Sequence, residues 1–542
     1  MPRIPQLSEL SIEQRIGQVL CFGWQGESDA ESRRVIPHAR ELVETMQVGG
    51  VVLLGRNVDS ANPLRTRAVL DELQAMSRVP LFLAIDQEGG SVNRFRAPFH
   101  EFPGNMAIGA IATGEAGVAA GELYARRQAE AQARELLAAG INWNFAPVVD
   151  VNNNPDNPII GVRSYGEDPQ LVARLGAAAI RGYQEAGLLA CAKHFPGHGD
   201  TSVDSHLALP TINGDRARLA SVELVPFDRA ILEGVGAIMT THILFPALDP
   251  ARPATLSQPI LTGLLRRELG YDGLVITDCL EMDAIASTFG TARGAVEALK
   301  AGADMVLVCH TLETQRETVE AIRSAVESCE LPESRLNEAV ECVLAAKRRF
   351  LSSPSVVERE PWRDPAIDSL EREIAEASIT VVRATTGPLA VIPVRRNARI
   401  LAVSMHPAVD SFAESVRRQS RGRATVDRLH LAEYTNEDLD LENIESYDSI
   451  VALTCPHEPW SVSPIDPRRQ ARLVRILAAA AEGNLIVVAI REPYDIREFN
   501  SVPTYICTYG YRRSSLVALA ALLFGDIRAT ARLPVTVEGA SA

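Results

Sequence analysis

The chain has 542 residues, of which 46% are hydrophobic and 23% charged, proportions that are ordinary for a globular protein. Its formal net charge of −15 argues against a nucleic-acid partner, because phosphate binding needs a basic surface. Apolar runs such as 485–490 have the length of a strand and fall short of the ~20 residues of a membrane-spanning helix, so we expect no membrane partner.

The N-terminal segment and the cysteines bear on the compartment. MPRIPQLSEL has no apolar core of the signal-peptide type. The eight cysteines are scattered without a CxxC pair, and several lie inside apolar runs. This pattern is typical of buried free thiols in a reducing compartment. We therefore expect a cytoplasmic protein.

Eight short β-rich runs, separated by stretches of helical pattern, occur in the first 311 residues. They are 18–24, 48–55, 81–87, 141–150, 188–195, 236–243, 273–278 and 303–310. Most are continuously apolar, as strands buried on both faces of a parallel sheet require. Between them a helix is expected to open at Asn62-Pro63, and others to end at Gly140 and Gly302. This alternation predicts a (β/α)8 TIM-type barrel over residues 1–350, with a doubly wound open sheet as the main competitor.

A break and a second α/β region follow. Residues 351–369 carry three prolines and no sustained apolar period, and we assign 351–380 to a linker. Apolar runs then resume, with helical stretches between them, at 389–394, 400–406, 449–455, 484–490 and 504–509. We predict a C-terminal α/β sandwich domain over 381–542, which is long enough to hold a core of its own.

Polar side chains follow the ends of five of the eight predicted barrel strands. They are Asp86 and Glu88, then Asp150, then Lys193, His194 and His198, then Thr240, Thr241 and His242, and finally Asp278. All strands of a parallel barrel end at the same rim, where barrel enzymes hold their active sites. We therefore expect the functional site there. Asp278 offers a carboxylate nucleophile, or else an N-cap for the following segment CLEMDAI.

The loop KHFPGHGDTSVDSH (193–206) carries three histidines, two aspartates and two glycines. Nitrogen and oxygen donors suit zinc or iron, and four of its side chains could ligate a metal, namely His194, His198, Asp200 and His206. Alternatively, Asp204 and His206 could face one way on an extended loop, so that the carboxylate orients the imidazole and makes it a general acid. No HExxH helix or cysteine ligand set supports the metal alternative, and we expect no metal and no cofactor.

Several long motifs, in a fixed order, resemble glycoside hydrolase family 3 and its β-N-acetylglucosaminidase branch in particular. They are AIDQEGGSVNRF (84–95), NFAPVVDVN (144–152), RSYGEDP (163–169), KHFPGHGDTSVDSH (193–206), IMTTHILFPALDP (238–250), PATLS (253–257) and VITDCLEMDAI (275–285). AIREPYDI (489–496) and LLFGDIRATARLPV (522–535) resemble the family's C-terminal domain, although Ala531 stands where a glycine is common. The resemblance covers nearly the whole chain.

The resemblance implies a role for each matching residue. Asp278 takes the nucleophile position, His206 the acid/base position and Asp204 that of its dyad partner, since the DSH triplet marks this branch. Positions that hold the sugar's hydroxyls, where carboxylates accept and basic side chains donate, are matched by Asp86, Arg163, Lys193 and His194. Arg94 lies in the same motif as Asp86, and Met282 and the region of His242 are expected to line the sugar subsite.

The activity implied is that of a retaining exo-β-N-acetylglucosaminidase acting on muropeptide fragments or chito-oligosaccharides through a covalent glycosyl-enzyme. A neutral histidine acid repels an anionic acceptor less than a carboxylate does, so a phosphorylase is an alternative. Further alternatives are β-glucosidase or β-xylosidase specificity, a metal-dependent hydrolase and a non-catalytic sugar-binding protein. The expected partner is a small carbohydrate, and the expected state a monomer or homodimer.

Overall fold

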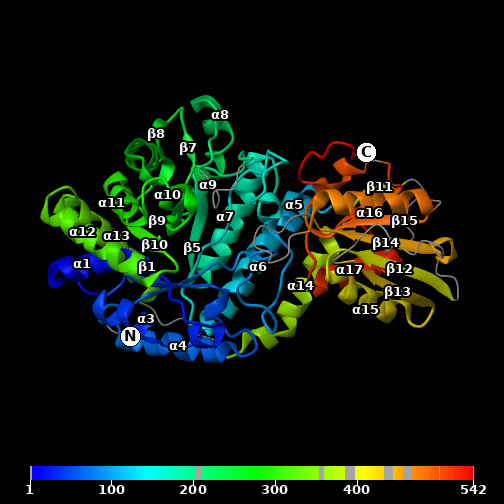
Figure 1. Cartoon of the computed structure of the whole chain (residues 1–542), viewed down its shortest axis with the longest axis horizontal. Coiled ribbons are helices and arrows are strands. Elements are labelled where there is room, and N and C mark those ends of the chain that lie inside the picture. The colour runs from blue at the N-terminus through cyan, green and yellow to red at the C-terminus, as the bar shows by residue number, and fades with distance from the viewer. Residues whose placement is uncertain are drawn as a thin grey trace.

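The computed structural model describes residues 3–202, 209–352, 359–384, 397–431, 444–455, 465–481, 483–499 and 501–540. The chain forms a barrel and a second α/β domain that lie side by side (Figure 1). Among these residues no helix is both long enough and apolar enough to cross a membrane.

Eight parallel strands close into a barrel in the order β1-β10-β9-β6-β5-β4-β3-β2. They are β1 (Leu20–Phe22), β2 (Gly50–Leu53), β3 (Phe82–Ile85), β4 (Trp143–Asn144), β5 (Leu189–Phe195), β6 (Ala237–Thr240), β9 (Leu274–Cys279) and β10 (Met305–Val308). Each strand overlaps one of the eight predicted runs, so the predicted TIM-type barrel is confirmed and the open sheet is excluded. A two-stranded ribbon of β7 (Leu244–Phe245) and β8 (Asp249–Pro253) follows β6.

Side chains fill the barrel instead of leaving a pore, and helices surround it. Phe82, Trp143, Leu189, Leu274 and Met305 belong to one buried apolar cluster inside the strands. The surrounding helices include α1 (Ile12–Gln18), α4 (Pro63–Met76), α6 (Gly117–Ala138), α7 (Pro169–Glu185), α9 (Val225–Leu232), η6 (Pro259–Glu268), α11 (Thr291–Ala301), α12 (Leu312–Glu327) and α13 (Glu333–Leu351). As predicted, α4 opens at Pro63.

The C-terminal domain is a three-layer α/β structure. Its sheet has the order β11-β16-β15-β14-β12-β13, and only β11 is antiparallel to its neighbour. The strands are β11 (Thr380–Ala384), β12 (Ala398–Ser404), β13 (Ala424–His430), β14 (Ser449–Thr454), β15 (Leu485–Ala489) and β16 (Thr504–Cys507). Helices α15 (Ala408–Ser420) and α17 (Arg513–Leu523) cover one face and α16 (Pro467–Ala480) the other (Figure 1). The predicted α/β sandwich is confirmed, while the predicted run 389–394 lies outside the described residues.

A packed helix occupies much of the range 351–380 that we assigned to a linker. Here η7 (Pro361–Arg363) leads into α14 (Pro365–Ser378), whose buried residues Ile367, Leu370 and Ile374 have helical spacing. The proline at position 365 does not break this helix, because it stands at the first helical position, where its missing N–H costs nothing. The three prolines of this range favour a linker in the sequence, but one of them, Pro365, begins a helix.

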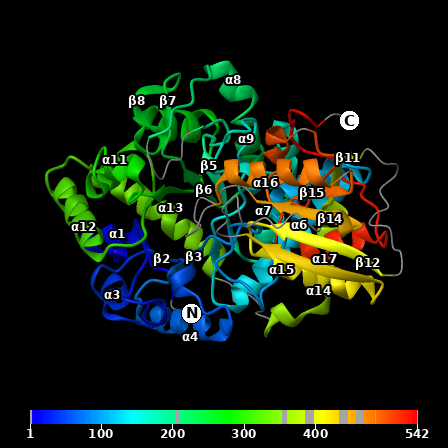
Figure 2. The same ribbon diagram turned by 45° about the vertical axis from the view of Figure 1, so that its right-hand side comes forward.

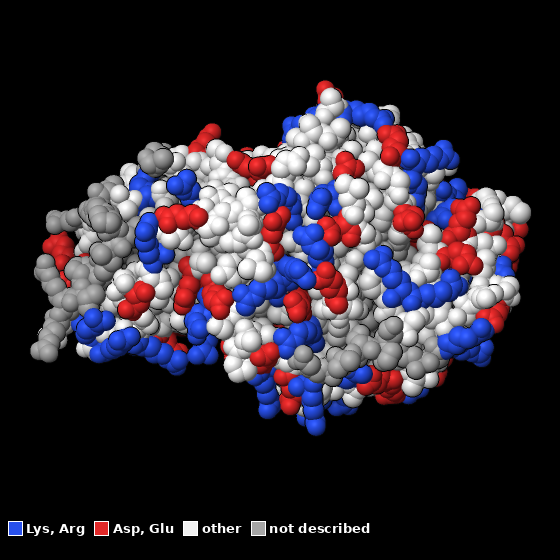
Figure 3. Space-filling model, turned by 180° about the vertical axis from the view of Figure 1, so that it is seen from behind, with Lys and Arg blue, Asp and Glu red and all other residues white. Residues whose placement is uncertain are grey.

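The two domains share an apolar boundary, with α5 (Asn105–Thr113) and α14 lying between them (Figure 1). In the turned view of Figure 2, elements of the C-terminal domain lie in front of α6 and α7 of the barrel. Met106, Ala107 and Ala110 on α5 belong to the same buried cluster as the C-terminal sheet. Close packing across the boundary extends to the backbone, because a Cβ at Gly114 would come within 2.4 Å of Thr530 O. From behind, acidic and basic side chains intermingle over the described surface of both domains (Figure 3).

Candidate active site

A cavity of about 440 Å³ opens at the end of the barrel where the strands finish. The predicted site residues that line it are Asp86, Arg94, Arg163, Lys193, His194, Asp278 and Met282. Asp204 and His206, the predicted acid/base dyad, lie outside the described residues. His242 does not line the cavity, because its ring is buried beneath the wall between Thr255 Oγ1 (2.8 Å) and Cys279 O (3.0 Å).

One additional residue in β9 brings two consecutive side chains to the cavity. Met305 of β10 pairs with Ile276 and Leu307 with Cys279, so two steps along β10 match three along β9. In a regular strand, neighbouring side chains point to opposite faces, whereas a bulge re-aims them. Asp278 and Cys279 consequently both line the cavity.

The same irregularity occurs in β5. Ala192 pairs with Ile238 of β6 and Phe195 with Thr240, so three steps along β5 match two along β6. The neighbours Lys193 and His194 therefore both line the cavity. The two bulges place four chemically active side chains on a rim where regular strands would offer two.

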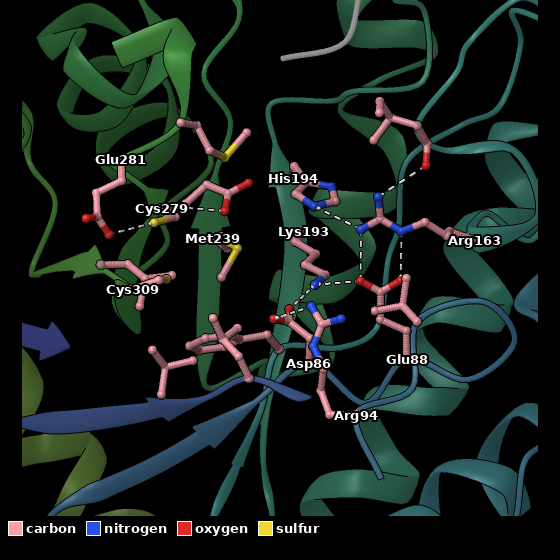
Figure 4. Close-up of a pocket in the computed structure, with 18 of the residues that line it drawn as sticks. Asp86, Glu88, Arg94, Arg163, Lys193, His194, Met239, Cys279, Glu281 and Cys309 are labelled. Carbon is pink, nitrogen blue, oxygen red and sulfur yellow. Dashed lines mark hydrogen bonds and ion pairs between the residues drawn. The ribbon is translucent and has the colours of Figure 1, made fainter. Parts of the chain in front are cut away.

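Glu88 is the centre of a buried charge network (Figure 4). Arg163 donates to both of its carboxylate oxygens, from Nε and Nη2 at 2.8 Å each, and Lys193 Nζ lies 2.7 Å from Oε1. Burial alone would raise the pKa of Glu88, but the charges of Arg163 and Lys193 outweigh it and hold this pKa well below the usual range. Burial likewise opposes the charge of Lys193, but Asp86 and Glu88 raise its pKa above normal. The network is thus ionised at neutral pH.

Asp86 carries this network to the cavity surface. Its Oδ1 accepts from Lys193 Nζ at 2.8 Å, and its Oδ2 lies 3.4 Å from Arg94 Nη2. The Asp86 side chain is 19% exposed, whereas those of Lys193 and Glu88 are 2% exposed. A carboxylate can accept about four hydrogen bonds, so Asp86 retains capacity for groups inside the cavity.

Asp150 holds the start of the histidine-rich loop. His194 Nδ1 donates to its Oδ2 at 2.7 Å, and the backbone N–H groups of His194 and His198 donate to its Oδ1 at 3.1 and 2.8 Å. Burial opposes the charge of Asp150, but His194 lowers its pKa overall. Burial and then His194 lower the pKa of His198 to about 4, so that its ring is neutral. Asp200, the third member of the suggested metal set, pairs with Arg218 at 3.1 Å instead.

Two thiols and an imidazole gather on the opposite wall, where β9 and β10 end. Ligand atoms of Cys279, Cys309 and His310 all lie within 4.8 Å of one another, the one such group among the described residues. A hydrogen bond with Cys309 lowers the pKa of Cys279 to about 7, although burial acts in the other direction. Figure 4 shows Cys279, Cys309 and Glu281 on the far side of the cavity from Glu88 and Arg163.

The pattern of the glycosyl hydrolase family 3 N terminal domain matches residues 11–346. The chain belongs to glycoside hydrolase family 3. Beta-hexosaminidase A of Pseudoalteromonas piscicida is 32% identical to it, over 98% of this chain and 97% of that protein. A beta-hexosaminidase of Alkalilimnicola ehrlichii is 39% identical, over 52% of this chain and 79% of that protein. The solved structure of a family 3 β-N-acetylglucosaminidase from Paenibacillus sp. str. FPU-7 is 37% identical, with a TM-score of 0.84 over 97% of this chain and 99% of that one.

This family 3 chain is therefore a glycoside hydrolase, and the resemblance read from its motifs is confirmed. Two features of the cavity were not assigned from the sequence. The sequence identifies Glu88 only as a carboxylate at a strand end, although its position two residues after Asp86 is a signal that the two carboxylates share a site. The Cys279–Cys309 contact depends on β9 and β10 being neighbouring strands. The sequence predicts that pairing only if the eight strands form a barrel.

Proposed function

We propose that the enzyme removes a terminal, non-reducing β-linked N-acetylglucosamine with retention, using Asp278 as the nucleophile. The observation that carries the proposal is the place of Asp278 in the barrel. β9 and β3 are four strands apart in either direction around the eight-stranded order, so the nucleophile candidate lies across the mouth from Asp86. A sugar held by Asp86, Lys193 and Arg163 would present its anomeric carbon to the wall that carries Asp278.

Asp278 has the properties that a carboxylate nucleophile needs. It is partly buried, and one oxygen, Oδ1, accepts the Cys279 N–H at 2.7 Å, which orients the carboxylate. In the proposed reaction, Asp278 attacks the anomeric carbon while His206, oriented by Asp204, protonates the leaving oxygen. His206 then removes a proton from water, and the hydroxide displaces Asp278 to release the sugar. The dyad assignment rests on the sequence resemblance.

The size of the cavity supports exo action. About 440 Å³ lies near the lower end of the ~300–1,000 Å³ range of small-molecule sites, which suits one sugar unit rather than a longer chain. The relatives named beta-hexosaminidase and the solved β-N-acetylglucosaminidase support N-acetylglucosamine as that unit.

A second cavity of about 680 Å³ adjoins the first and shares Gly55 and Arg94 with it. Its charged lining consists of four basic and two acidic side chains, which are Arg33, Arg94, Arg96, Arg491, Asp29 and Asp59. This excess of positive charge favours an anionic leaving group, and therefore muropeptide fragments over neutral chito-oligosaccharides. Arg491 comes from the C-terminal domain, which would thus shape the aglycone side.

The test is Asp278→Ala against an aryl β-N-acetylglucosaminide, with Asp272→Asn, an exposed carboxylate just before β9, as the control. Loss of the nucleophile should lower kcat by about 10³-fold or more, while the control stays at the wild-type rate. Asp278→Ala activity within tenfold of wild type would refute the assignment. A slow fluorinated substrate should label wild-type enzyme on the peptide containing Asp278.

The same assay separates the alternatives. Comparing the rates on aryl glucoside, xyloside and N-acetylglucosaminide identifies the preferred sugar. Repeating the assay with added phosphate identifies the acceptor, because a phosphorylase would release a sugar phosphate. We expect hydrolysis of the N-acetylglucosaminide both with and without phosphate. Full activity after exhaustive chelation is expected and would exclude the metal-dependent hydrolase.

A further inference from the structure

The thiol pair on the cavity wall has no part in the proposed hydrolysis. Cys279 ends β9, and Cys309 and His310 directly follow β10. The two cysteines are buried but line the cavity, and His310 is exposed beside them. A ligand entering the sugar cavity therefore reaches all three side chains.

The donor atoms match the requirements of a thiolate metal site. Zinc bonds of about 2.3 Å to sulfur and about 2.0 Å to nitrogen place tetrahedral ligand atoms roughly 3.5–3.8 Å apart. The three ligand atoms already lie within 4.8 Å of one another. Side-chain rotations that move these atoms by roughly 1 Å would bring them to tetrahedral spacing. Thiolate and imidazole donors select soft or borderline ions such as Zn²⁺ and Cd²⁺ over Mg²⁺ or Ca²⁺.

The backbone that carries these ligands is already fixed. Glu281 accepts the backbone N–H groups of His310 (2.7 Å) and Thr311 (2.9 Å), and its Oε2 is 3.9 Å from Cys279 Sγ. Arg56 Nη2 donates to Cys309 O at 2.7 Å. These contacts hold the two loops together without an ion, which lowers the ordering cost of binding one.

The His310 ring already makes one contact with a neighbouring side chain. Arg56 Nη1 lies 3.1 Å from His310 Nδ1, and because a guanidinium can only donate, Nδ1 accepts this hydrogen bond. An imidazole binds a metal through one of its two ring nitrogens. Arg56 would keep its hydrogen bond to Cys309 O whichever nitrogen of His310 binds the cation. Two thiolates would neutralise the charge of a divalent ion.

We propose that Cys279, Cys309 and His310 form a site for a soft divalent cation, Zn²⁺ or Cd²⁺, and that its occupation inhibits the enzyme. Three protein ligands leave a fourth tetrahedral position open. Asp278, the residue before Cys279, lines the same cavity, and its carboxylate is a suitable fourth ligand. A carboxylate bound to the ion could not attack the sugar. The ion is thus an inhibitor and takes no part in catalysis.

Binding is tested with Co²⁺ as a spectroscopic probe on the full-length, reduced protein under anaerobic conditions. We expect one Co²⁺ per chain, with a thiolate-to-cobalt charge-transfer band that Zn²⁺ abolishes by competition. Cys279→Ser and Cys309→Ser should lose most of the band and bind Zn²⁺ at least ~100-fold more weakly, since even outer-shell changes cost 10–100-fold. Cys329→Ser is the matched control, because Cys329 is an exposed free cysteine outside the cavity. A band that persists in both cavity variants, or no stoichiometric binding by wild type, would overturn the site.

Inhibition is tested separately, because it rests on the proposed function whereas binding does not. Zn²⁺ should inhibit wild type and Cys329→Ser alike, and a chelator should restore both. Each cavity variant, compared with its own metal-free rate, should need at least ~100-fold more Zn²⁺. Stoichiometric Zn²⁺ binding without loss of activity would overturn the inhibitory role. If wild type cleaved no N-acetylglucosaminide, the proposed function would fail while the cobalt spectra still decided the site.

Discussion

Glu88 binds Arg163 through two parallel hydrogen bonds of 2.8 Å, in a pair whose side chains are 2% and 7% exposed. Lys193 adds a third contact at 2.7 Å and extends the network to Asp86. Desolvation offsets much of the attraction within a buried ion pair, so such a pair adds little net stability. The consequence of the network is geometric, because Glu88 fixes Arg163 and Lys193 at the base of the cavity before any sugar binds.

Glu88→Gln should therefore lower both stability and activity. The substitution keeps the shape of the side chain but leaves two buried cations with insufficient negative charge. Removing one partner of a buried pair costs about 3–5 kcal/mol of unfolding free energy. We also expect kcat/KM to fall by about 100-fold, since a loss of ~2.7 kcal/mol in binding the transition state corresponds to that factor. Chemical denaturation and steady-state kinetics measure the two effects.

The control for this substitution is Glu44→Gln, a half-exposed carboxylate whose pair with Arg40 lies on the barrel surface. It should change stability by less than ~1 kcal/mol. A Glu88→Gln enzyme with wild-type melting and wild-type kcat/KM would show that the network is dispensable.

Asp150→Asn should impair catalysis through His194. Asparagine can still accept the two backbone N–H groups, but it loses the charge that holds His194 Nδ1–H. A hydrogen bond to a charged group contributes about 1.5–3 kcal/mol, so kcat/KM should fall by roughly 10–150-fold. Asp156→Asn, an exposed residue of the same loop paired with Arg497, should leave kcat/KM unchanged. Equal rates for the two variants would contradict the orienting role.

The barrel core contains a lysine that makes stability depend on pH. Lys347 is fully buried, donates to Gln18 Oε1 at 2.6 Å and lies 5.5 Å from the Phe82 ring centroid. Burial lowers its pKa from 10.5 to about 7. Between pH 7 and 10.5 the unfolded chain therefore holds a proton at this site that the folded chain does not. Stability then rises with pH in this window, by up to about 1.4 kcal/mol per pH unit, and is flat below it.

Lys347→Met removes this titration, so the wild-type minus variant difference in unfolding free energy should rise between pH 7 and 10. Urea denaturation at several pH values measures it. Lys300→Met is the control, because contacts with Glu297 raise the pKa of Lys300, and its contribution is constant below pH 10.5. A difference curve for Lys347→Met as flat as the control would contradict a neutral buried lysine.

Glu167 ties the RSYGEDP motif of the barrel to the end of the chain. Its carboxylate accepts from Thr536 N at 2.7 Å and Thr536 Oγ1 at 2.6 Å, and its own N–H donates to Pro534 O. Glu167→Ala should destabilise the protein by about 1–3 kcal/mol and expose the terminal segment to protease. Glu115→Ala breaks an exposed pair with Arg528 in the same segment and should cost at most ~1 kcal/mol. Limited proteolysis with melting curves distinguishes the two.

Features that depend on local sequence patterns could be predicted, whereas those that depend on the register between strands could not. Apolar runs locate all eight barrel strands, and the convergence of strand ends brings Asp86, Lys193 and Asp278 to one cavity. The bulges in β5 and β9 depend on the register between neighbouring strands, which no local pattern shows. The contact between Cys279 and Cys309 also depends on the register between β9 and β10. The predicted dyad of Asp204 and His206 stays a prediction.

The arginine-rich second cavity gives a prediction about substrate charge. Arg96 is exposed at its rim and Arg491 is buried in its wall, so Arg96→Ala and Arg491→Met should weaken binding of an anionic aglycone. An exposed charge pair is worth up to about 1 kcal/mol, or up to ~5-fold in KM, whereas a buried one at Arg491 should cost ~10–100-fold. A neutral aryl N-acetylglucosaminide serves as the internal control, because a folding defect would slow both substrates equally. KM values that rise equally for anionic and neutral substrates would contradict an anionic aglycone at this cavity.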